Sequence, residues 1–188
     1  MIMAYRPGIV VLCGRSFSGK STVAAALAAE LAAVPLSFDA INAERGLISG
    51  DGVPVQEWAR TYAQAQDRAR RAIEAGSAVI IDDTSSPRFL RDGWRDLAAG
   101  LEVPMVLVYV DTPVEVSLAR HADNRAASVR ADVSDKIMSG HLDSFQAPTA
   151  DEDPVRLVDG RLTPQRSLEI RRRLTADGGR DRRARGAT

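Results

Sequence analysis

The chain has 188 residues, of which 45% are hydrophobic and 27% charged, and its 25 acidic residues balance its 25 basic ones. These numbers predict one soluble globular domain, and they exclude both a membrane-spanning chain and a strongly basic nucleic-acid-binding body. The single cysteine, Cys13, excludes an internal disulfide or a cysteine-based zinc site, and the start MIMAYRPG lacks the apolar core of a signal peptide, so we expect a cytoplasmic location.

The first half of the chain alternates short β-rich runs with longer helical runs. The apolar run Ile9–Cys13 is expected to be a buried parallel strand, and a helical period follows from Ser21 to Ala33. A second strand is expected over Val34–Phe38, and a glycine-rich loop over residues 46–54. Apolar residues three and four positions apart then predict an amphipathic helix from Val55 to Ala75.

The second half of the chain continues this alternation. Strands that alternate with helices imply parallel βαβ units with right-handed crossovers, so the expected fold is a three-layer α/β sandwich. We find no repeat and no linker, so residues 1–175 are expected to form one domain, followed by a disordered basic tail over residues 176–188. The remaining elements are predicted to be a strand over Ala78–Ile81, a helix over Pro87–Ala99, a strand over Val103–Val110, a helix over Val114–His121, a helix over Ser134–Phe145, a strand over Val155–Val158 and a helix from Pro164 to about Leu174.

A glycine-rich stretch, GRSFSGKST, stands between the first strand and the first helix and matches the pattern G-x-x-x-x-G-K-[ST]. Glycines let backbone N–H groups surround an anion, and the start of the helix adds the positive end of its dipole. Lys20 is predicted to reach the β- and γ-phosphates, and the Ser21 hydroxyl is predicted to bind Mg²⁺. The sequence therefore predicts a site for a nucleoside triphosphate, built by Gly14, Arg15, Ser16, Phe17, Ser18, Gly19, Lys20, Ser21 and Thr22.

Carboxylates are expected beside this loop, because the carboxyl ends of parallel strands open on one crevice. Asp82, after the run Ala78–Ile81, is predicted to hold Mg²⁺, with Asp83 as the alternative metal-facing acid and a helix cap as the other interpretation of Asp82. Asp39, after the second strand, is predicted to accept the proton of an acceptor hydroxyl; the other interpretation is a turn aspartate.

The polar stretch that follows the fourth strand carries Arg120, Arg125 and Arg130. On a lid over about residues 121–135, such arginines would neutralise a phosphoryl group in transfer and exclude water when the lid closes. Arg120 and Arg125 are the predicted catalytic arginines, and Arg125 is also expected to contact ATP. The alternative interpretation is a solvated charged loop.

At these residues the sequence resembles the small P-loop kinases that phosphorylate hydroxyl groups of non-protein substrates, among them chloramphenicol phosphotransferase, zeta-toxin-like kinases, gluconate kinase and polynucleotide kinases. The resemblance rests on GRSFSGKST, the aspartate in SFDAIN, the segment VIIDDTSS and the arginines of ARHADNR. It implies a five-stranded parallel sheet in the order 2-3-1-4-5 with a small helical lid, and ATP and Mg²⁺ as cofactors. It also implies ATP and Mg²⁺ roles for Lys20 and Ser21, a catalytic base at Asp39, a substrate-side D-x-T element at Asp82 and Thr84, and lid arginines at Arg120 and Arg125.

These features together predict an ATP-dependent phosphotransferase that acts on a hydroxyl of a small molecule such as an antibiotic, a sugar or a nucleoside, in a monomer or a homodimer. Tyr62 is a candidate to contact the acceptor. It also follows a helical apolar stripe, so a position in the hydrophobic core is the alternative interpretation. Arg88 and Arg91 are candidates to bind an acidic acceptor, or else they belong to a solvated helix face. The predicted acceptor contacts are Asp39, Tyr62, Thr84 and Arg88.

Two other functions stay open at this point. A kinase for a nucleic-acid end is favoured by one feature, the basic tail that begins near Arg171. A regulatory ATPase or nucleotide switch with a protein partner is the alternative from a different class. A guanine-reading N-K-x-D motif is absent from the sequence, which favours adenine. His121 and His141 have no companions at metal-ligand spacing, and the sequence assigns them no chemistry.

Overall fold

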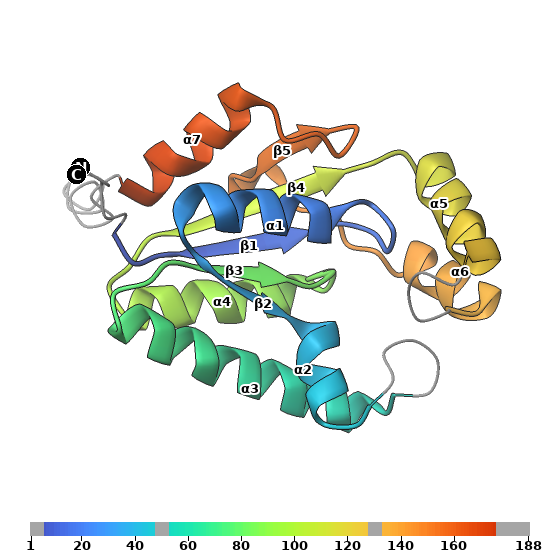
Figure 1. The fold of residues 1–188 in the computed structure, drawn as a ribbon, viewed down its shortest axis with the longest axis horizontal. Helices are drawn as coiled ribbons and strands as arrows, with labels where there is room; N and C mark the ends of the chain where they lie inside the picture. The colour runs from blue at the N-terminus through green and yellow to red at the C-terminus, as the bar shows by residue number, and fades with distance from the viewer. Residues whose placement is uncertain (1–5, 48–52, 128–132, 176–188) are drawn as a thin grey trace, which may run out of the picture.

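The computed structural model describes residues 6–47, 53–127 and 133–175. All strand pairs in the sheet are parallel, and the strand order is β2-β3-β1-β4-β5 (Figure 1). The expected α/β fold with sheet order 2-3-1-4-5 is therefore confirmed. The strands are β1 (Ile9–Cys13), β2 (Val34–Ser37), β3 (Val79–Asp82), β4 (Met105–Asp111) and β5 (Val155–Val158).

Helices cover both faces of this sheet, and a further pair lies beyond the carboxyl end of β4. In Figure 1, α1 and α7 lie on one face, α3 and α4 lie on the other, and α5 and α6 extend to one side. None of the helices in the described ranges is both long and apolar enough to cross a membrane. The helices are α1 (Lys20–Leu31), α2 (Phe38–Glu44), α3 (Val55–Glu74), α4 (Arg88–Gly100), α5 (Val114–Ala127), α6 (Asp135–Asp143), the 3₁₀ helix η1 (Ala150–Glu152) and α7 (Pro164–Thr175).

The central strand β1 shows why its sequence is a continuous apolar run rather than an alternating one. Successive side chains of a strand point to opposite faces, and here both faces are covered by helices. Val10 and Leu12 belong to the core beneath α1 and α7, whereas Ile9, Val11 and Cys13 belong to the core beneath α3 and α4. All five residues are fully buried, so the strand ends at a fixed place and delivers the glycine-rich loop to the carboxyl edge of the sheet.

The second strand ends earlier than the sequence predicts, and a short helix that we did not expect follows it. Strand β2 stops at Ser37, and α2 begins at Phe38, with the Ser37 hydroxyl accepting a hydrogen bond from the Ala40 N–H at 3.3 Å. Serine at such a position favours a helix start, because its side chain satisfies an N–H group that has no partner within the helix. Asp39 consequently lies in the first turn of a helix and not in a turn between elements.

The helix that follows β4 is longer than the predicted Val114–His121 and continues to Ala127. Its buried side chains are the polar residues Ser117, His121 and Asn124, spaced four and three apart. A search for apolar periodicity does not detect a stripe of polar residues, which is why the sequence reads as a loop here. Arg120 and Arg125 therefore project from a helix, while Arg130, part of the predicted lid and the tail 176–188 lie outside the described residues.

The core around α4 allows a direct test of stability. Trp94 is the largest fully buried side chain among the described residues, and its ring packs edge-on against Tyr62 with 5.3 Å between centroids. We expect Trp94→Ala to lower the free energy of unfolding by about 3–5 kcal/mol, because it removes a large buried surface and leaves a cavity. Urea denaturation followed by circular dichroism measures this loss.

Phe89→Ala provides the control on the same helix, since Phe89 is 71% exposed. Its effect on the free energy of unfolding should stay within about 0.5 kcal/mol. Equal losses for the two variants would contradict the packing of α4 described above.

Candidate active site

The glycine-rich loop connects β1 to α1 and turns sharply at Gly19, whose φ of 100° lies in the left-handed region that favours glycine. Lys20, the first residue of α1, is buried, and its Nζ donates hydrogen bonds to the carbonyl oxygens of Gly14 at 3.0 Å and Arg15 at 2.8 Å. The ammonium group therefore lies inside the curve of the loop. A fixed positive charge at a helix N-terminus is an arrangement that binds phosphate.

The loop is also held from the side of β4 and β5. The Thr112 hydroxyl, just beyond β4, donates to the Ser18 carbonyl at 2.7 Å. Gly14 has no room for a side chain, since a Cβ there would lie 2.8 Å from both the Ser18 hydroxyl oxygen and the Val110 carbonyl oxygen. The path of the loop is thus fixed by close backbone approach before any ligand binds.

A pocket of about 340 Å³ opens beside this loop. Arg120, on α5, reaches the loop through its Nη1, which donates to the carbonyl oxygens of Phe17 at 3.2 Å and Ser18 at 3.0 Å. A pocket of this size beside a phosphate loop suits the nucleoside part of a nucleotide. Its lining residues are Phe17, Gly19, Thr22, Arg120 and Gly160.

Gly160, in the turn after β5, is a site residue that the sequence did not reveal. Its φ is 66°, and a Cβ on it would lie 2.3 Å from the Thr112 hydroxyl oxygen and 2.8 Å from the Ser18 carbonyl oxygen. A glycine after a short strand reads as an ordinary turn residue, and only the fold brings this turn to the glycine-rich loop.

Carboxylates meet the loop from the next strand. Asp82 ends β3, and the backbone N–H of Gly14 donates to the Thr84 carbonyl at 3.2 Å, which joins this segment to the loop. Burial raises the pKa of Asp83, the charge of Asp39 raises it further, and hydrogen bonds from the Ser85 and Thr84 N–H groups and the charge of Lys20 oppose the rise. The charges of Lys20 and Asp39 thus both act on Asp83.

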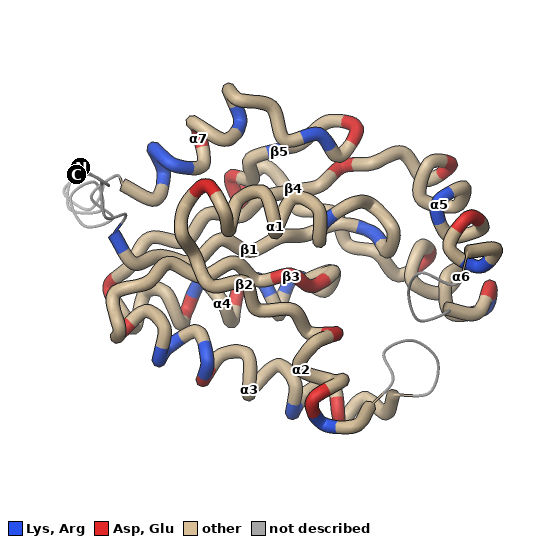
Figure 2. Tube along the Cα trace, viewed as in Figure 1, with Lys and Arg blue, Asp and Glu red and all other residues tan. Residues whose placement is uncertain are grey.

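Asp39 approaches this region from the neighbouring strand. Ser37 pairs with Asp82 in the register of β2 and β3, so Asp39 follows only two positions beyond the paired ends. It lies in the first turn of α2, the short helix that begins directly after β2. Figure 2 shows acidic positions at the end of β3 and the start of α2, on the side of the sheet that also holds basic positions in the loop before α1.

The donor set at this edge fits a magnesium ion. Ser21 offers a hydroxyl in the first turn of α1, and Asp82 offers a carboxylate at the end of β3, the strand beside β1. Within the described ranges no cluster of three or more histidine, cysteine or acidic residues could hold a metal by itself. Mg²⁺ commonly takes one or two protein oxygens and completes its shell with phosphate oxygens and water, so this small set suffices.

The second predicted lid arginine makes a different contact from Arg120. Arg125 donates from Nη1 to both carboxylate oxygens of Asp135, at 2.9 and 3.0 Å, and from Nη2 to the Val133 carbonyl at 3.0 Å. It thereby ties α5 to the start of α6. Arg120, by contrast, donates hydrogen bonds to the Phe17 and Ser18 carbonyls of the glycine-rich loop.

Both histidines of the chain contact the glycine-rich loop, although no motif predicts this position for either of them. The His121 ring packs against the Phe17 ring with centroids 5.1 Å apart. His141 Nδ1 lies 3.2 Å from the Ser16 hydroxyl oxygen. Since His121 belongs to α5 and His141 to α6, both of these helices contact the loop directly.

Tyr62 lies in the core between α3 and α4. Its ring packs against those of Phe38 and Trp94, and its hydroxyl donates to the Leu90 carbonyl at 2.9 Å. Burial, together with the charges of Asp83 and Asp96, raises the pKa of Tyr62 to about 12. Of the two interpretations of Tyr62, acceptor contact and core residue, the structure shows the core position.

The two arginines after the D-x-T segment are both engaged within the protein. Arg88 forms ion pairs with Asp151 and Asp92 and is about half exposed. Arg91 is 1% exposed and pairs with Glu152. The expectation that Arg91 binds an acidic acceptor or belongs to a solvated face is therefore wrong, because the side chain points into the protein.

The role of Gly160 can be tested by adding one methyl group. We expect Gly160→Ala to weaken binding of the ATP analogue AMPPNP by at least about tenfold, equivalent to 1.4 kcal/mol, because the new Cβ displaces Thr112 and Ser18 and so distorts the loop. Isothermal titration calorimetry measures this change.

The matched control for this test is Gly76→Ala. Gly76 also has a positive φ, 89°, but a Cβ there meets nothing within 4 Å. Both variants carry similar backbone strain, so a loss of affinity in both would trace to strain and remove the local explanation.

The chain is similar to one protein-family model and to several proteins named as kinases. Residues 9–148 match the model of the family AAA_33, described as an AAA domain. The thymidylate kinase of Thermomicrobium roseum is 29% identical over 181 residues, which cover 81% of this chain and 86% of that protein. The gluconokinase of Gluconobacter oxydans is 26% identical over 171 residues, which cover 89% of this chain and 90% of that protein.

A solved structure shares the fold at lower sequence similarity. The Mycobacterium tuberculosis APS kinase CysC, determined in complex with AMPPNP and APS, superposes with a TM-score of 0.65 at 22% identity. The match covers 88% of this chain and 96% of that one. The arrangement of the sheet and its flanking helices is therefore common to both chains.

Proposed function

The chain belongs to the AAA_33 family of AAA domains, and we propose that it is an ATP-dependent kinase that transfers the γ-phosphate of ATP to a hydroxyl group of a small molecule. Two relatives that match most of its length are named as kinases, and a third protein of the same fold is a kinase bound to an ATP analogue. The glycine-rich loop, with Lys20 inside its curve, supplies the phosphate site.

The observation that carries this proposal is geometric: Lys20 lies inside the glycine-rich loop, and the pairing of Ser37 with Asp82 places Asp39 two positions beyond the strand ends at the same edge of the sheet. A site that only binds a nucleotide needs the loop and its lysine. A site that transfers a phosphoryl group to an alcohol also needs a group that takes the proton of the attacking hydroxyl. A carboxylate on α2, across from the loop, meets that need.

In the proposed reaction the loop amides and Lys20 bind the β- and γ-phosphates and neutralise their charge. Ser21 and Asp82 would hold Mg²⁺, which supplies further charge neutralisation at the phosphate oxygens when bound. Asp39 orients the acceptor hydroxyl and accepts its proton as the oxygen attacks the γ-phosphorus. Arg120 contacts the nucleotide from α5, and Arg125 fixes α5 to α6 so that the two helices move together over the phosphates.

The acceptor contacts are assigned to Thr84, whose carbonyl accepts from the Gly14 N–H of the loop, and to Asp39, which follows the paired ends of β2 and β3. The polar ends of Tyr62 and Arg88 contact Leu90 and Asp151 instead, so these two residues support the site from outside. The acceptor itself is expected to be an antibiotic, a sugar or a nucleoside.

The experiment that tests this function measures ADP release from Mg-ATP across a panel of hydroxyl compounds. The panel contains aminoglycoside, nucleoside and phenicol antibiotics, sugars, nucleosides and 5′-hydroxyl oligonucleotides. We expect one small molecule to raise turnover sharply. Stimulation by the oligonucleotides alone would favour a nucleic-acid-end kinase, and slow turnover that no compound changes would favour a regulatory ATPase.

A further inference from the structure

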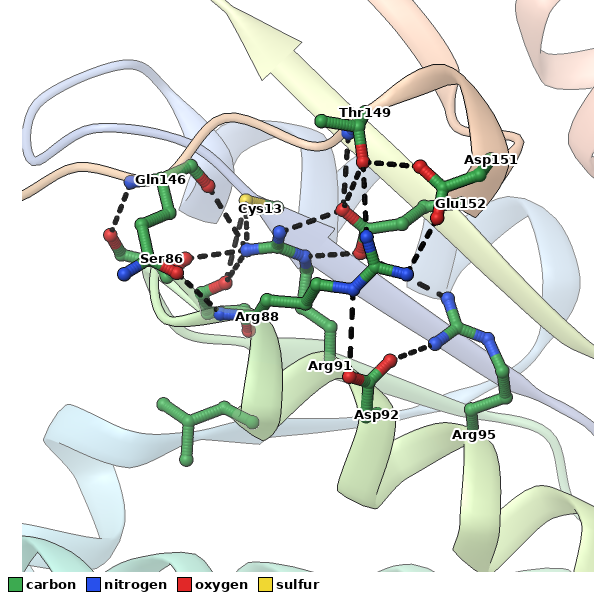
Figure 3. Close-up of polar contacts among 12 residues, drawn as sticks. Cys13, Ser86, Arg88, Arg91, Asp92, Arg95, Gln146, Thr149, Asp151 and Glu152 are labelled. Carbon is green, nitrogen blue, oxygen red and sulfur yellow. Dashed lines mark hydrogen bonds and ion pairs between the residues drawn. The ribbon is translucent and has the colours of Figure 1, made fainter.

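A buried ion pair lies behind the proposed site, where α4 meets the 3₁₀ helix η1 (Figure 3). Arg91 donates from Nε to Glu152 Oε2 at 2.7 Å and from Nη2 to Oε1 at 2.8 Å, and the two side chains are 1% and 0% exposed. Burial raises the pKa of Glu152, but the hydrogen bonds from Arg91 and the Thr149 N–H outweigh this and lower it overall. The pair is therefore ionised.

The remaining donor nitrogen of Arg91 joins two segments that are far apart in the sequence. Nη1 donates to the carbonyl oxygens of Ser85 at 2.9 Å and Gln146 at 3.0 Å, and also to that of Ser86. The Gln146 N–H in turn donates to the Ser86 hydroxyl at 3.1 Å. One guanidinium thus holds the segment after β3 against the segment after α6, as the dashed lines in Figure 3 show.

The segment after β3 carries the site carboxylates. The backbone N–H of Ser85, whose carbonyl binds Arg91, donates to Asp83 Oδ2 at 2.8 Å. The same carbonyl accepts a hydrogen bond from the Cys13 thiol at 3.5 Å, at the end of β1. A shift of the Ser85 peptide therefore moves Asp83 relative to the start of the glycine-rich loop.

The segment after α6 contacts that loop as well. Phe145, which precedes Gln146, lies beneath the Arg15 guanidinium, whose carbon is 4.8 Å from the ring centroid. Its ring also stacks on Tyr109, on β4, with 6.2 Å between centroids. Arg91 thus contacts both the segment after β3, through the Ser85 and Ser86 carbonyls, and the segment after α6, through the Gln146 carbonyl.

We propose that Arg91 is a positioning residue for phosphoryl transfer, and that its hydrogen bonds to the Ser85, Ser86 and Gln146 carbonyls set the distance between Asp83, the glycine-rich loop and the end of α6. The proposal rests on the proposed kinase function. It follows from the fork shape of the guanidinium, which can bind a carboxylate with one edge and carbonyl oxygens with its other nitrogen.

An ordinary stabilising ion pair is the competing explanation, and the two can be separated. Buried ion pairs are replaceable by apolar residues of similar size with little loss of stability, because the desolvation penalty disappears with the charges. The double variant Arg91→Met/Glu152→Met removes both charges together and so leaves neither buried alone. It also removes every hydrogen bond from Arg91 to the three carbonyls.

We expect this double variant to keep the melting temperature of the wild type and its affinity for AMPPNP, while kcat for ADP release falls by about 10²-fold, the cost of a displacement near 1 Å. Hydrogen–deuterium exchange should rise in peptides that cover residues 83–87 and 145–152 and stay unchanged in α7. Wild-type kcat together with wild-type exchange in those peptides would overturn the proposal.

Arg91→Lys tests the same point if the double variant does not fold, since lysine keeps the charge next to Glu152 but not the fork. The proposal expects the same loss of kcat, and full activity in this variant would refute it. Arg95→Met is the matched control, because Arg95 lies one turn further along α4 and reaches Glu152 at 4.0 Å but none of the three carbonyls. A wild-type protein without ADP release would instead contradict the kinase function, and the exchange measurement would still test the role of Arg91.

Discussion

Lys20→Ala is expected to reduce phosphoryl transfer to background, a loss of at least roughly 10²–10³-fold in kcat, which is the usual cost of removing one charge-stabilising group from a transition state. Lys20 Nζ lies between the Gly14 and Arg15 carbonyls, inside the loop, where the β- and γ-phosphates would bind. The sequence holds one other lysine, Lys136, which belongs to α6 and not to the loop. ADP release from Mg-ATP in the presence of the stimulating acceptor measures the effect.

Lys136→Ala is the control for this experiment, because it removes the other, exposed lysine of the chain. Its turnover should equal that of the wild type. Lys20 is buried, so the melting temperature of Lys20→Ala must be measured beside its activity. A folded Lys20→Ala protein that retains substantial turnover would show that the loop binds phosphate without serving transfer.

The fold and the phosphate loop were predictable because their signals are local. Ile9–Cys13 is apolar throughout since both faces of β1 are covered, and the pattern from Gly14 to Ser21 must follow such a strand and precede a helix. The order of strands followed from the resemblance to small P-loop kinases and is confirmed. The strand and the loop pattern each lie within a short stretch of the chain, so the sequence alone carries them, whereas the strand order needed the resemblance.

The parts that could not be predicted depend on contacts between distant segments. Arg91 and Glu152 are separated by 61 positions, and nothing in RFLRDGWR marks Arg91 as the arginine that is buried. Gly160 reaches the site only because β5 lies beside β4. The histidines of α5 and α6 have no motif, and their contacts with the loop arise from how these helices pack.

Two local signals were present but were outweighed in the prediction. Ser37 before Phe38 and Ile41 fits the start of a helix, but α2 has only seven residues, too few for a hydrophobic period to stand out. The buried face of α5 is polar, so its helical period escaped a search based on hydrophobicity. In both places the helix determines where a predicted site residue points: Asp39 in the first case and Arg125 in the second.

The second large loss of activity is expected on substitution of Asp39. We expect Asp39→Asn to bind AMPPNP as tightly as the wild type but to lose about 10²–10⁴-fold in kcat for the stimulated reaction, the range attributed to general acid–base groups. The amide keeps the size of the side chain and its place in the first turn of α2, but it cannot take a proton from the acceptor hydroxyl. Calorimetry with AMPPNP and ADP release with the acceptor separate binding from transfer.

Glu44→Gln is the matched control for Asp39→Asn, because Glu44 ends the same helix and the substitution removes the same charge. Glu44 pairs with Arg68 at the surface, and such exposed pairs contribute little, so its kcat should equal that of the wild type. Equal losses in both variants would point to damage of α2 as a whole. Normal transfer by Asp39→Asn would remove Asp39 from the mechanism and leave Asp83, whose pKa is raised by burial and by the charge of Asp39, as the carboxylate to test next.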